Sequence, residues 1–179
     1  MISKFKTAFR RLINDESGSA TVEFVLVFPL YLSFMLMSIE LGFVTMRHTL
    51  LERGLDMAVR EVRLGTGTAP GHDAIKDLVC DNAIMVLNCK EKLKLEMRPA
   101  NIFALNTLDT TPDCTDKAET AKPVVYKFFP GVANQLMLMR ACYKYEPFFP
   151  KQFLGSALDK DPSGEAKIVS MTAFVQEPN

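Results

Sequence analysis

The pattern of apolar positions changes character partway along the chain. From Val22 to Met46 the only ionisable side chains are Glu23 and Glu40, and about 20 apolar residues are enough for a helix to cross a bilayer core. From Val44 onward, apolar residues recur at helical spacings between charged ones, as on one face of an amphipathic helix. The pattern predicts one long helix over residues 19–64, apolar on all sides in its first half. The apolar stripe of its second half comprises Val44, Leu51, Leu55, Ala58 and Val62.

After this helix, the pattern becomes that of a small mixed domain. Gly and Pro residues in the linker 65–71 end the helix, and a short helix is expected from about Asp73. Three later stretches alternate apolar and polar residues with period two, which predicts half-buried strands. We therefore expect an α+β fold in which a compact head, residues 72–179, contains an antiparallel sheet and a packed helix. The expected apolar strand faces are Leu93, Leu95 and Met97, then Met137, Met139, Ala141, Tyr143 and Tyr145, then Val169, Met171, Ala173 and Val175.

Charge asymmetry predicts the orientation of the apolar run in a membrane. Basic residues crowd positions 4–11, and such residues stay on the cytoplasmic side. The head would then lie in the periplasm or outside the cell, where disulfides form. A cleaved secretory signal is the competing interpretation, but its apolar core usually has about 7–15 residues and a small-residue cleavage site. No such site follows this run.

The four cysteines, Cys80, Cys89, Cys114 and Cys142, all follow the apolar run. Their wide separations and only two histidines argue against zinc, so no metal site is expected. Of the three possible pairings, we favour Cys80 with Cys89 and Cys114 with Cys142. The first of these requires the helix to end before Cys89, because nine helical residues would rise about 13.5 Å. Asn88 suits such a turn.

Enzymatic chemistry has no visible motif in this sequence. The nucleophile elbow, the zinc protease motif, the P-loop and the dinucleotide turn are all missing, so we expect no enzyme, cofactor or small-molecule substrate. The formal net charge of zero argues against nucleic acid as a partner. An acid pair assembled by the fold is the remaining enzymatic possibility, and a hydrolase screen would test it.

One motif stands at the start of the apolar run, Gly18-Ser-Ala-Thr-Val-Glu23-Phe24, with Pro29 six residues after the glutamate. With basic residues before it and an amphipathic helix and head after it, the motif resembles a type IV pilin. It is similar in particular to the TadE-like minor pilins, or pseudopilins, of tight-adherence systems. The ending Gln176-Glu177-Pro178-Asn179 is a partial second match, because the family's final aromatic residue is missing.

The resemblance implies a processed assembly subunit. Residues 1–18 would be a leader that prepilin peptidase removes, so that Ser19 becomes the new amino terminus. Glu23 would then pair with the Ser19 ammonium of a neighbouring subunit, which reduces the cost of a carboxylate in hydrocarbon. Implied partners are the bacterial inner membrane, prepilin peptidase, other pilins and pilus assembly proteins. The implied role is assembly of a tight-adherence pilus used in adhesion and surface colonisation.

Each of these features also has a plainer interpretation. Glu23 could be an interfacial residue at a helix N-terminus, which the helix macrodipole favours. Pro29 could be a tolerated membrane proline rather than a kink useful for leaving the bilayer. Glu40 is expected near the far edge of the hydrocarbon. The alternative to a pilin is an uncleaved, single-span membrane protein with a periplasmic binding head.

Overall fold

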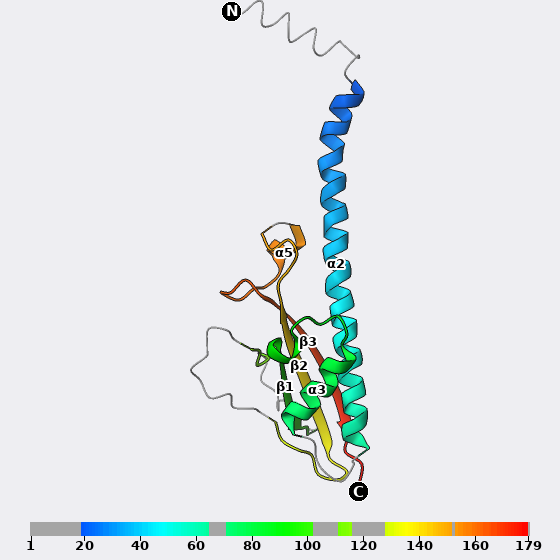
Figure 1. Ribbon diagram of the computed structural model, residues 1–179, viewed down its shortest axis with the longest axis vertical. Helices are drawn as coiled ribbons and strands as arrows, with labels where there is room; N and C mark the ends of the chain where they lie inside the picture. Colours follow the sequence, from blue (N-terminus) through cyan, green and yellow to red (C-terminus); the bar gives the residue numbers. More distant parts are fainter. Residues whose placement is uncertain (1–18, 65–70, 102–110, 116–127, 152, 179) are drawn as a thin grey trace, which may run out of the picture. The chain divides into compact units, whose positions relative to one another are not determined.

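The computed structural model describes residues 19–64, 71–101, 111–115, 128–151 and 153–178. The strands form one antiparallel sheet in the order β1-β2-β3. A long apolar helix followed by this sheet and further helices confirms the expected α+β class (Figure 1). In chain order the elements are α2 (Ser19–Arg63), α3 (His72–Asn82), α4 (Cys89–Lys92), β1 (Leu93–Pro99), β2 (Leu136–Tyr145), α5 (Phe153–Ala157) and β3 (Ala166–Val175).

Contacts divide the chain into two compact units, and the boundary falls inside α2. The first unit ends at Ile39 and the second runs from Glu40 to Asn179. The second half of α2 therefore folds as part of the head, whereas the sequence pattern suggested a head at residues 72–179. We use "head" below for the unit that begins at Glu40.

The apolar stripe of α2 forms one side of the head's core. Leu51, Leu55 and Ala58 are at most 1% exposed, and Val62 is also buried, as the helical spacing predicted. Gly54 lies on the same side, and a Cβ at this position would come within 2.6 Å of the Val79 carbonyl oxygen of α3. This glycine therefore permits the close approach of α2 and α3, a role that its ordinary helix penalty did not indicate.

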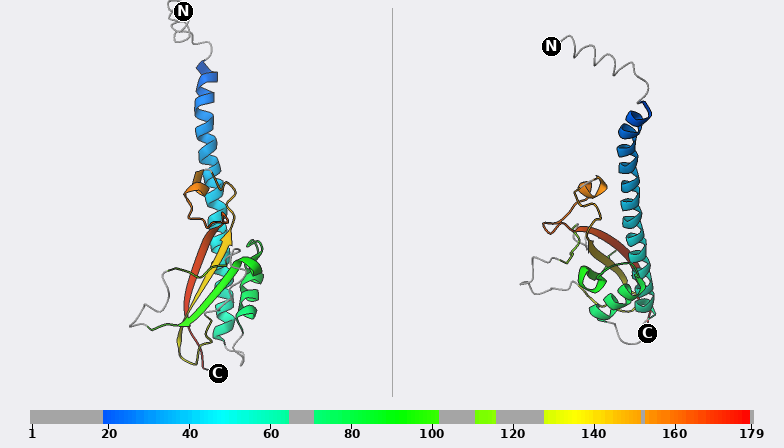
Figure 2. Two further views of the ribbon diagram at one scale, coloured as in Figure 1. Left: turned by 90° about the vertical axis from the view of Figure 1, so that its left-hand side faces the viewer. Right: turned by 45° about the horizontal axis from the view of Figure 1, so that its top comes forward.

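The other side of the core is one face of the sheet, which α2 and α3 cover (Figure 2). The predicted apolar faces of β1 and β2 are confirmed, since all their members are buried. Directly opposite residues of an antiparallel pair share a face. Leu93 pairs with Tyr143, and Met97 pairs with Met139. The two strands thus present one continuous apolar surface to the helices.

The face predicted for β3 is wrong. Tyr143 pairs with Ile168 and Met137 pairs with Phe174, so the even-numbered residues of β3 face the core. Ile168, Ser170 and Phe174 are buried, whereas Met171 is 59% exposed. Both faces of this strand carry apolar residues, and pairing with β2 rather than local hydrophobicity decides which face is buried.

The chain between α3 and β1 reverses direction, which allows Cys80 and Cys89 to form a disulfide. Helix α3 ends at Asn82, and Asn88 adopts a left-handed conformation, φ 52°, immediately before α4. The two cysteine Cα atoms are 5.6 Å apart and the residues form a disulfide. The helix ends before Cys89 as expected, but it ends at Asn82, and the left-handed turn at Asn88 leads into α4 rather than ending α3.

Candidate functional site

Residues 20–39 of α2, which we call the apolar segment, expose their side chains around the whole helix. Phe24, Leu26 and Phe34 are each more than 60% exposed. At about 1.5 Å per residue the segment is roughly 30 Å long, the thickness of a bilayer's hydrocarbon core. It is the one helix in the described part of the chain that is long and apolar enough to cross a membrane. A helix that is apolar on all sides needs lipid or other helices around it.

The predicted processing motif lies at the start of this segment. Gly18 is outside the described residues, and Ser19 is the first residue of α2. Glu23 is exposed and follows Ser19 by four residues, which is about 6 Å along the helix axis. The ring of Phe24 stacks on that of Phe28, with centroids 4.9 Å apart.

Pro29 lies inside α2, and the helix continues through it. Because proline has no N–H, the carbonyl of Val25 loses its helical hydrogen bond. The Ser33 hydroxyl donates to the Pro29 carbonyl at 2.7 Å, and the Ser38 hydroxyl donates to the Phe34 carbonyl at 2.8 Å. Such bonds satisfy serine in apolar surroundings and favour bending rather than unwinding.

The residue that directly follows the apolar segment, Glu40, is the most deeply buried acid of α2, with 1% of its surface exposed. Its two carboxylate oxygens accept separate hydrogen bonds from consecutive backbone N–H groups, those of Phe148 at 3.1 Å and Phe149 at 3.2 Å. We call this arrangement the Glu40 clamp. A carboxylate that accepts two such bonds is well satisfied away from water. The clamp fastens the chain after β2 to the first turn of the head's helix.

Aromatic contacts complete the attachment of this chain segment to α2. The ring of Phe148 packs against Phe43, with centroids 4.7 Å apart. The Arg47 guanidinium lies 5.2 Å from the centre of the Phe148 ring and 5.0 Å from that of Tyr145. Cation–π contacts of this kind stabilise a partly desolvated arginine. Burial raises the pKa of Tyr145, while the positive charge of Arg47 opposes that rise.

Sequence reasoning missed the Glu40 clamp, although a signal for it exists. Glu40, Val44 and Arg47 precede Leu51 at spacings of four, three and four residues. They therefore continue the apolar stripe of α2 toward its N-terminus. We expected Glu40 at the membrane edge and Arg47 on the polar face, because charged residues are rarely buried without partners. The partners here are aromatic rings and backbone groups from a part of the chain 100 residues later.

The outer face of the sheet, opposite the core, carries a second group of buried charges. Arg140 and Glu96 are cross-strand partners, and the Arg140 Nε donates to the Glu96 carboxylate at 2.6 Å. Both residues are at most 6% exposed. On the same face, the Lys144 ammonium donates to the Asp161 carboxylate at 2.7 Å. Close pairing offsets the cost of removing these charges from water.

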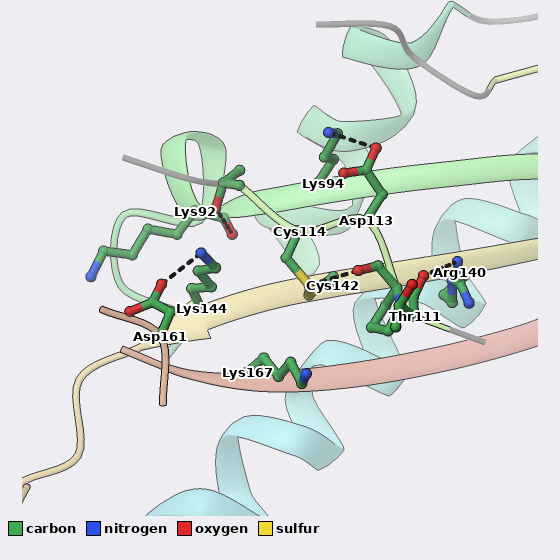
Figure 3. Close-up of a disulfide and its surroundings, with 12 residues drawn as sticks. Lys92, Lys94, Thr111, Asp113, Cys114, Arg140, Cys142, Lys144, Asp161 and Lys167 are labelled. Carbon is green, nitrogen blue, oxygen red and sulfur yellow. Dashed lines mark hydrogen bonds and ion pairs between the residues drawn. A yellow bond between two sulfur atoms is a disulfide. The ribbon is translucent and has the colours of Figure 1, made fainter. Parts of the chain in front are cut away.

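Residues 111–115 cross this charged face and are tied to it at several points (Figure 3). The Cys114–Cys142 disulfide attaches the middle of the segment to β2. The Lys94 ammonium lies 2.7 Å from the Asp113 carboxylate, and the Thr115 hydroxyl donates to the Lys92 carbonyl at 3.2 Å. The disulfide therefore holds a short segment over the charged residues of β1 and β2.

The partial C-terminal match also has a structural place. The Gln176 side-chain amide donates to the Val62 carbonyl at 3.0 Å. The Glu177 carboxylate lies 3.1 Å from the Arg63 guanidinium. Both contacts reach the last turn of α2, so the residues after β3 fasten the strand to the end of this helix. Among the described residues, no group of three or more His, Cys, Asp or Glu side chains is arranged to hold a metal ion.

A membrane-capable helix with Glu23 near its start, followed by a disulfide-bonded head, is the arrangement that the resemblance to pilins implies. Comparison with protein families makes this more specific, since residues 18–60 match the family described as TadE-like protein. The match covers the whole motif from Gly18 to Phe24, the apolar segment and most of the stripe of α2, and it confirms the resemblance to TadE-like proteins there. No curated protein and no solved structure matched the chain. The family match supports a pilin-like protein associated with a tight-adherence pilus.

Proposed function

We propose that this chain is a TadE-like minor pilin or pseudopilin that prepilin peptidase cleaves after Gly18. The cleaved subunit is held in the inner membrane and contributes to assembly of a tight-adherence pilus. The observation that carries the proposal is the fully exposed apolar segment with Glu23 near its start, inside the residues that match the family. A subunit of this design leaves the bilayer by exchanging lipid for the apolar helices of its neighbours.

The two disulfides support a head on the periplasmic side. Neither Cys80–Cys89 nor Cys114–Cys142 would persist in a reducing cytoplasm. The basic residues 4–11 favour a cytoplasmic N-terminus by the positive-inside rule. Both arguments give the same orientation, and the cut after Gly18 would then be made at the cytoplasmic face.

Cleavage would give Glu23 its partner. The new Ser19 amine has an ordinary pKa near 8 and is mostly charged at neutral pH. In a bundle of apolar helices, the Glu23 carboxylate of one subunit meets the Ser19 ammonium of the next. Pairing makes both charges tolerable in hydrocarbon and sets the axial register of the subunits. The head then lies at the filament surface, where it contributes to adhesion.

The test compares two substitutions that act at different steps. Gly18→Leu removes the small residue before the scissile bond, so we expect unprocessed precursor in the membrane. Glu23→Ala keeps the cut site, so we expect normal maturation with loss of the chain from sheared pili. Close charge pairs at interfaces are coupled by about 1.5 kcal/mol or more, so recovery in pili should fall about tenfold or more. Immunoblots of membranes and sheared pili measure both outcomes.

Glu61→Ala is the matched control, because Glu61 is an exposed acid on the same helix but belongs to the head. It should mature and enter pili like wild type. If Glu23→Ala entered pili as well as this control, Glu23 would have no assembly role. If Gly18→Leu and wild type gave chains of the same uncleaved length, the chain would be the alternative, a membrane-anchored protein with a periplasmic head.

A further inference from the structure

Phe148 is rigidly held, yet more than half of its side chain is open to the surroundings. Its ring contacts both the Phe43 ring and the Arg47 guanidinium, and its backbone N–H donates to the Glu40 carboxylate. It nevertheless remains 54% exposed. Single exposed apolar side chains are common on protein surfaces, so the position of this ring along α2 decides what it contacts. We call residues 146–151 the aromatic turn.

The aromatic turn is attached to α2 where a membrane span would end. A span of about 20 residues that starts at Ala20 ends at Ile39, and one that starts at Phe24 ends at Phe43. Phe148 contacts Glu40, which directly follows the first of these end points, Phe43, which is the second, and Arg47, one turn further along α2. The headgroup layer adds about 5–8 Å on each side of the hydrocarbon, equivalent to roughly three to five helical residues. Helical side chains also lean toward the N-terminus, which brings their contacts closer to the span.

The exposed chemistry around Phe148 suits lipid headgroups. Lys151 in the same turn is exposed, and Leu41 and Met46 of α2 are 55% and 36% exposed. An aromatic ring beside a lysine is a common anchor at the membrane surface, where the ring lies among the upper acyl groups and the ammonium reaches phosphate. Phe148, Leu41 and Met46 are thus exposed apolar residues of the head, whose first residue, Glu40, directly follows the apolar segment in the sequence. This placement favours lipid over a separate protein as their partner.

We propose that the aromatic turn rests in the headgroup layer of the bilayer, with Phe148 inserted and Lys151 at the phosphates. This inference rests on the proposed membrane location of the apolar segment. The contact holds the head at a fixed height on the membrane surface before assembly. It also adds a lipid contact that must be released when the subunit moves into a filament.

The chain contains no tryptophan, so the fluorescence of a single introduced tryptophan reports the depth of that one position in the bilayer. Three full-length variants are reconstituted separately in phosphatidylcholine–phosphatidylglycerol vesicles: Phe148→Trp, Leu30→Trp in the apolar segment, and Val132→Trp. Val132 precedes β2 and Phe148 follows it, so they lie beyond opposite ends of a strand about 30 Å long. Quenching is measured with lipids brominated either near the headgroup or near the chain end. Each variant counts as folded if both disulfides are intact and its near-ultraviolet circular dichroism spectrum matches that of the wild type.

Phe148→Trp should be quenched about twofold or more by the shallow bromine and less by the deep one, as expected for a ring at the interface. Leu30→Trp should be quenched strongly by the deep bromine, and Val132→Trp by neither. If Leu30→Trp is quenched and Phe148→Trp is not, the inference is overturned while the membrane span stands. If Leu30→Trp is not quenched either, the span and the inference both fail. Should Phe148→Trp misfold, Lys151→Trp in the same turn replaces it, with the same expected and contradicting results.

Discussion

Removing the Glu40 carboxylate should destabilise the head strongly. The carboxylate is 1% exposed and accepts hydrogen bonds from the N–H groups of Phe148 and Phe149. Hydrogen bonds to a charged group contribute about 1.5–3 kcal/mol each, and the two N–H groups would lose their partner in Glu40→Ala. Part of this loss is regained because no charge then needs to be buried. We therefore expect the free energy of unfolding to fall by about 2–4 kcal/mol, near the upper end of single-residue effects.

Glu40→Gln gives the graded comparison. The glutamine oxygen can accept from one N–H group, but its amide nitrogen is a donor and cannot accept from the other. About half of the loss should therefore remain. The free energies of unfolding of the variants are compared by urea unfolding of the full-length chain in detergent micelles. Unfolding is followed by near-ultraviolet circular dichroism, to which the buried Tyr143 and Tyr145 contribute.

Glu52→Ala is the control for the Glu40 variants, because Glu52 is an exposed acid on the same helix, half of whose side chain is accessible. It should change stability by less than about 0.5 kcal/mol. A Glu40→Ala variant as stable as this control would refute the clamp as a stabilising contact.

Three further predictions concern the outer face of the sheet. Replacing both Cys114 and Cys142 with serine should cost about 3–4 kcal/mol, estimated from the 28-residue separation that the bridge closes; urea midpoints would show this, and an unchanged midpoint would contradict it. Glu96→Ala should cost about 3–5 kcal/mol by leaving Arg140 buried without its carboxylate, whereas Glu96→Leu combined with Arg140→Met should recover most of the loss. Partial burial opposes ionisation of Asp161, but hydrogen bonds from Lys144, Ser163 and the Glu165 N–H hold its pKa well below the usual 3.8. Its stabilising effect should thus be complete above that value and be lost as the pH falls below it, so Asp161→Asn should be less stable than wild type at neutral pH and show a weaker loss of stability in acid.

Periodicity predicted the elements of this chain that are decided locally. The long helix, the faces of β1 and β2, and the turn at Asn88 all follow from spacing or from the conformational preference of one residue. The face of β3 does not, because Met171 and Val175 are more apolar than the buried Ser170, and only the register with β2 places Ser170 inward. Hydrophobicity along one strand cannot report which neighbour sets its register.

The candidate site also has a part that the sequence predicted and a part that it did not. Glu23 and its flanking motif are contiguous in the sequence and were visible there. The Glu40 clamp joins residues more than 100 positions apart, and its partners on the distant side are backbone N–H groups, which every residue except proline carries. The spacing along α2 indicates that Glu40 faces the core, but side-chain composition does not identify backbone partners of this kind. The buried pair of Glu96 and Arg140 similarly looked like the polar side of a strand, because alternation does not reveal that another segment covers that face.

The central claim is that this chain is processed like a pilin, and the mass of the mature polypeptide tests it most directly. The chain is purified without reduction from membranes or sheared pili of cells with active prepilin peptidase, and its intact mass and N-terminal peptide are determined. The account predicts a polypeptide that begins at Ser19 and carries both disulfides. A polypeptide from such cells that still begins at Met1 would contradict it.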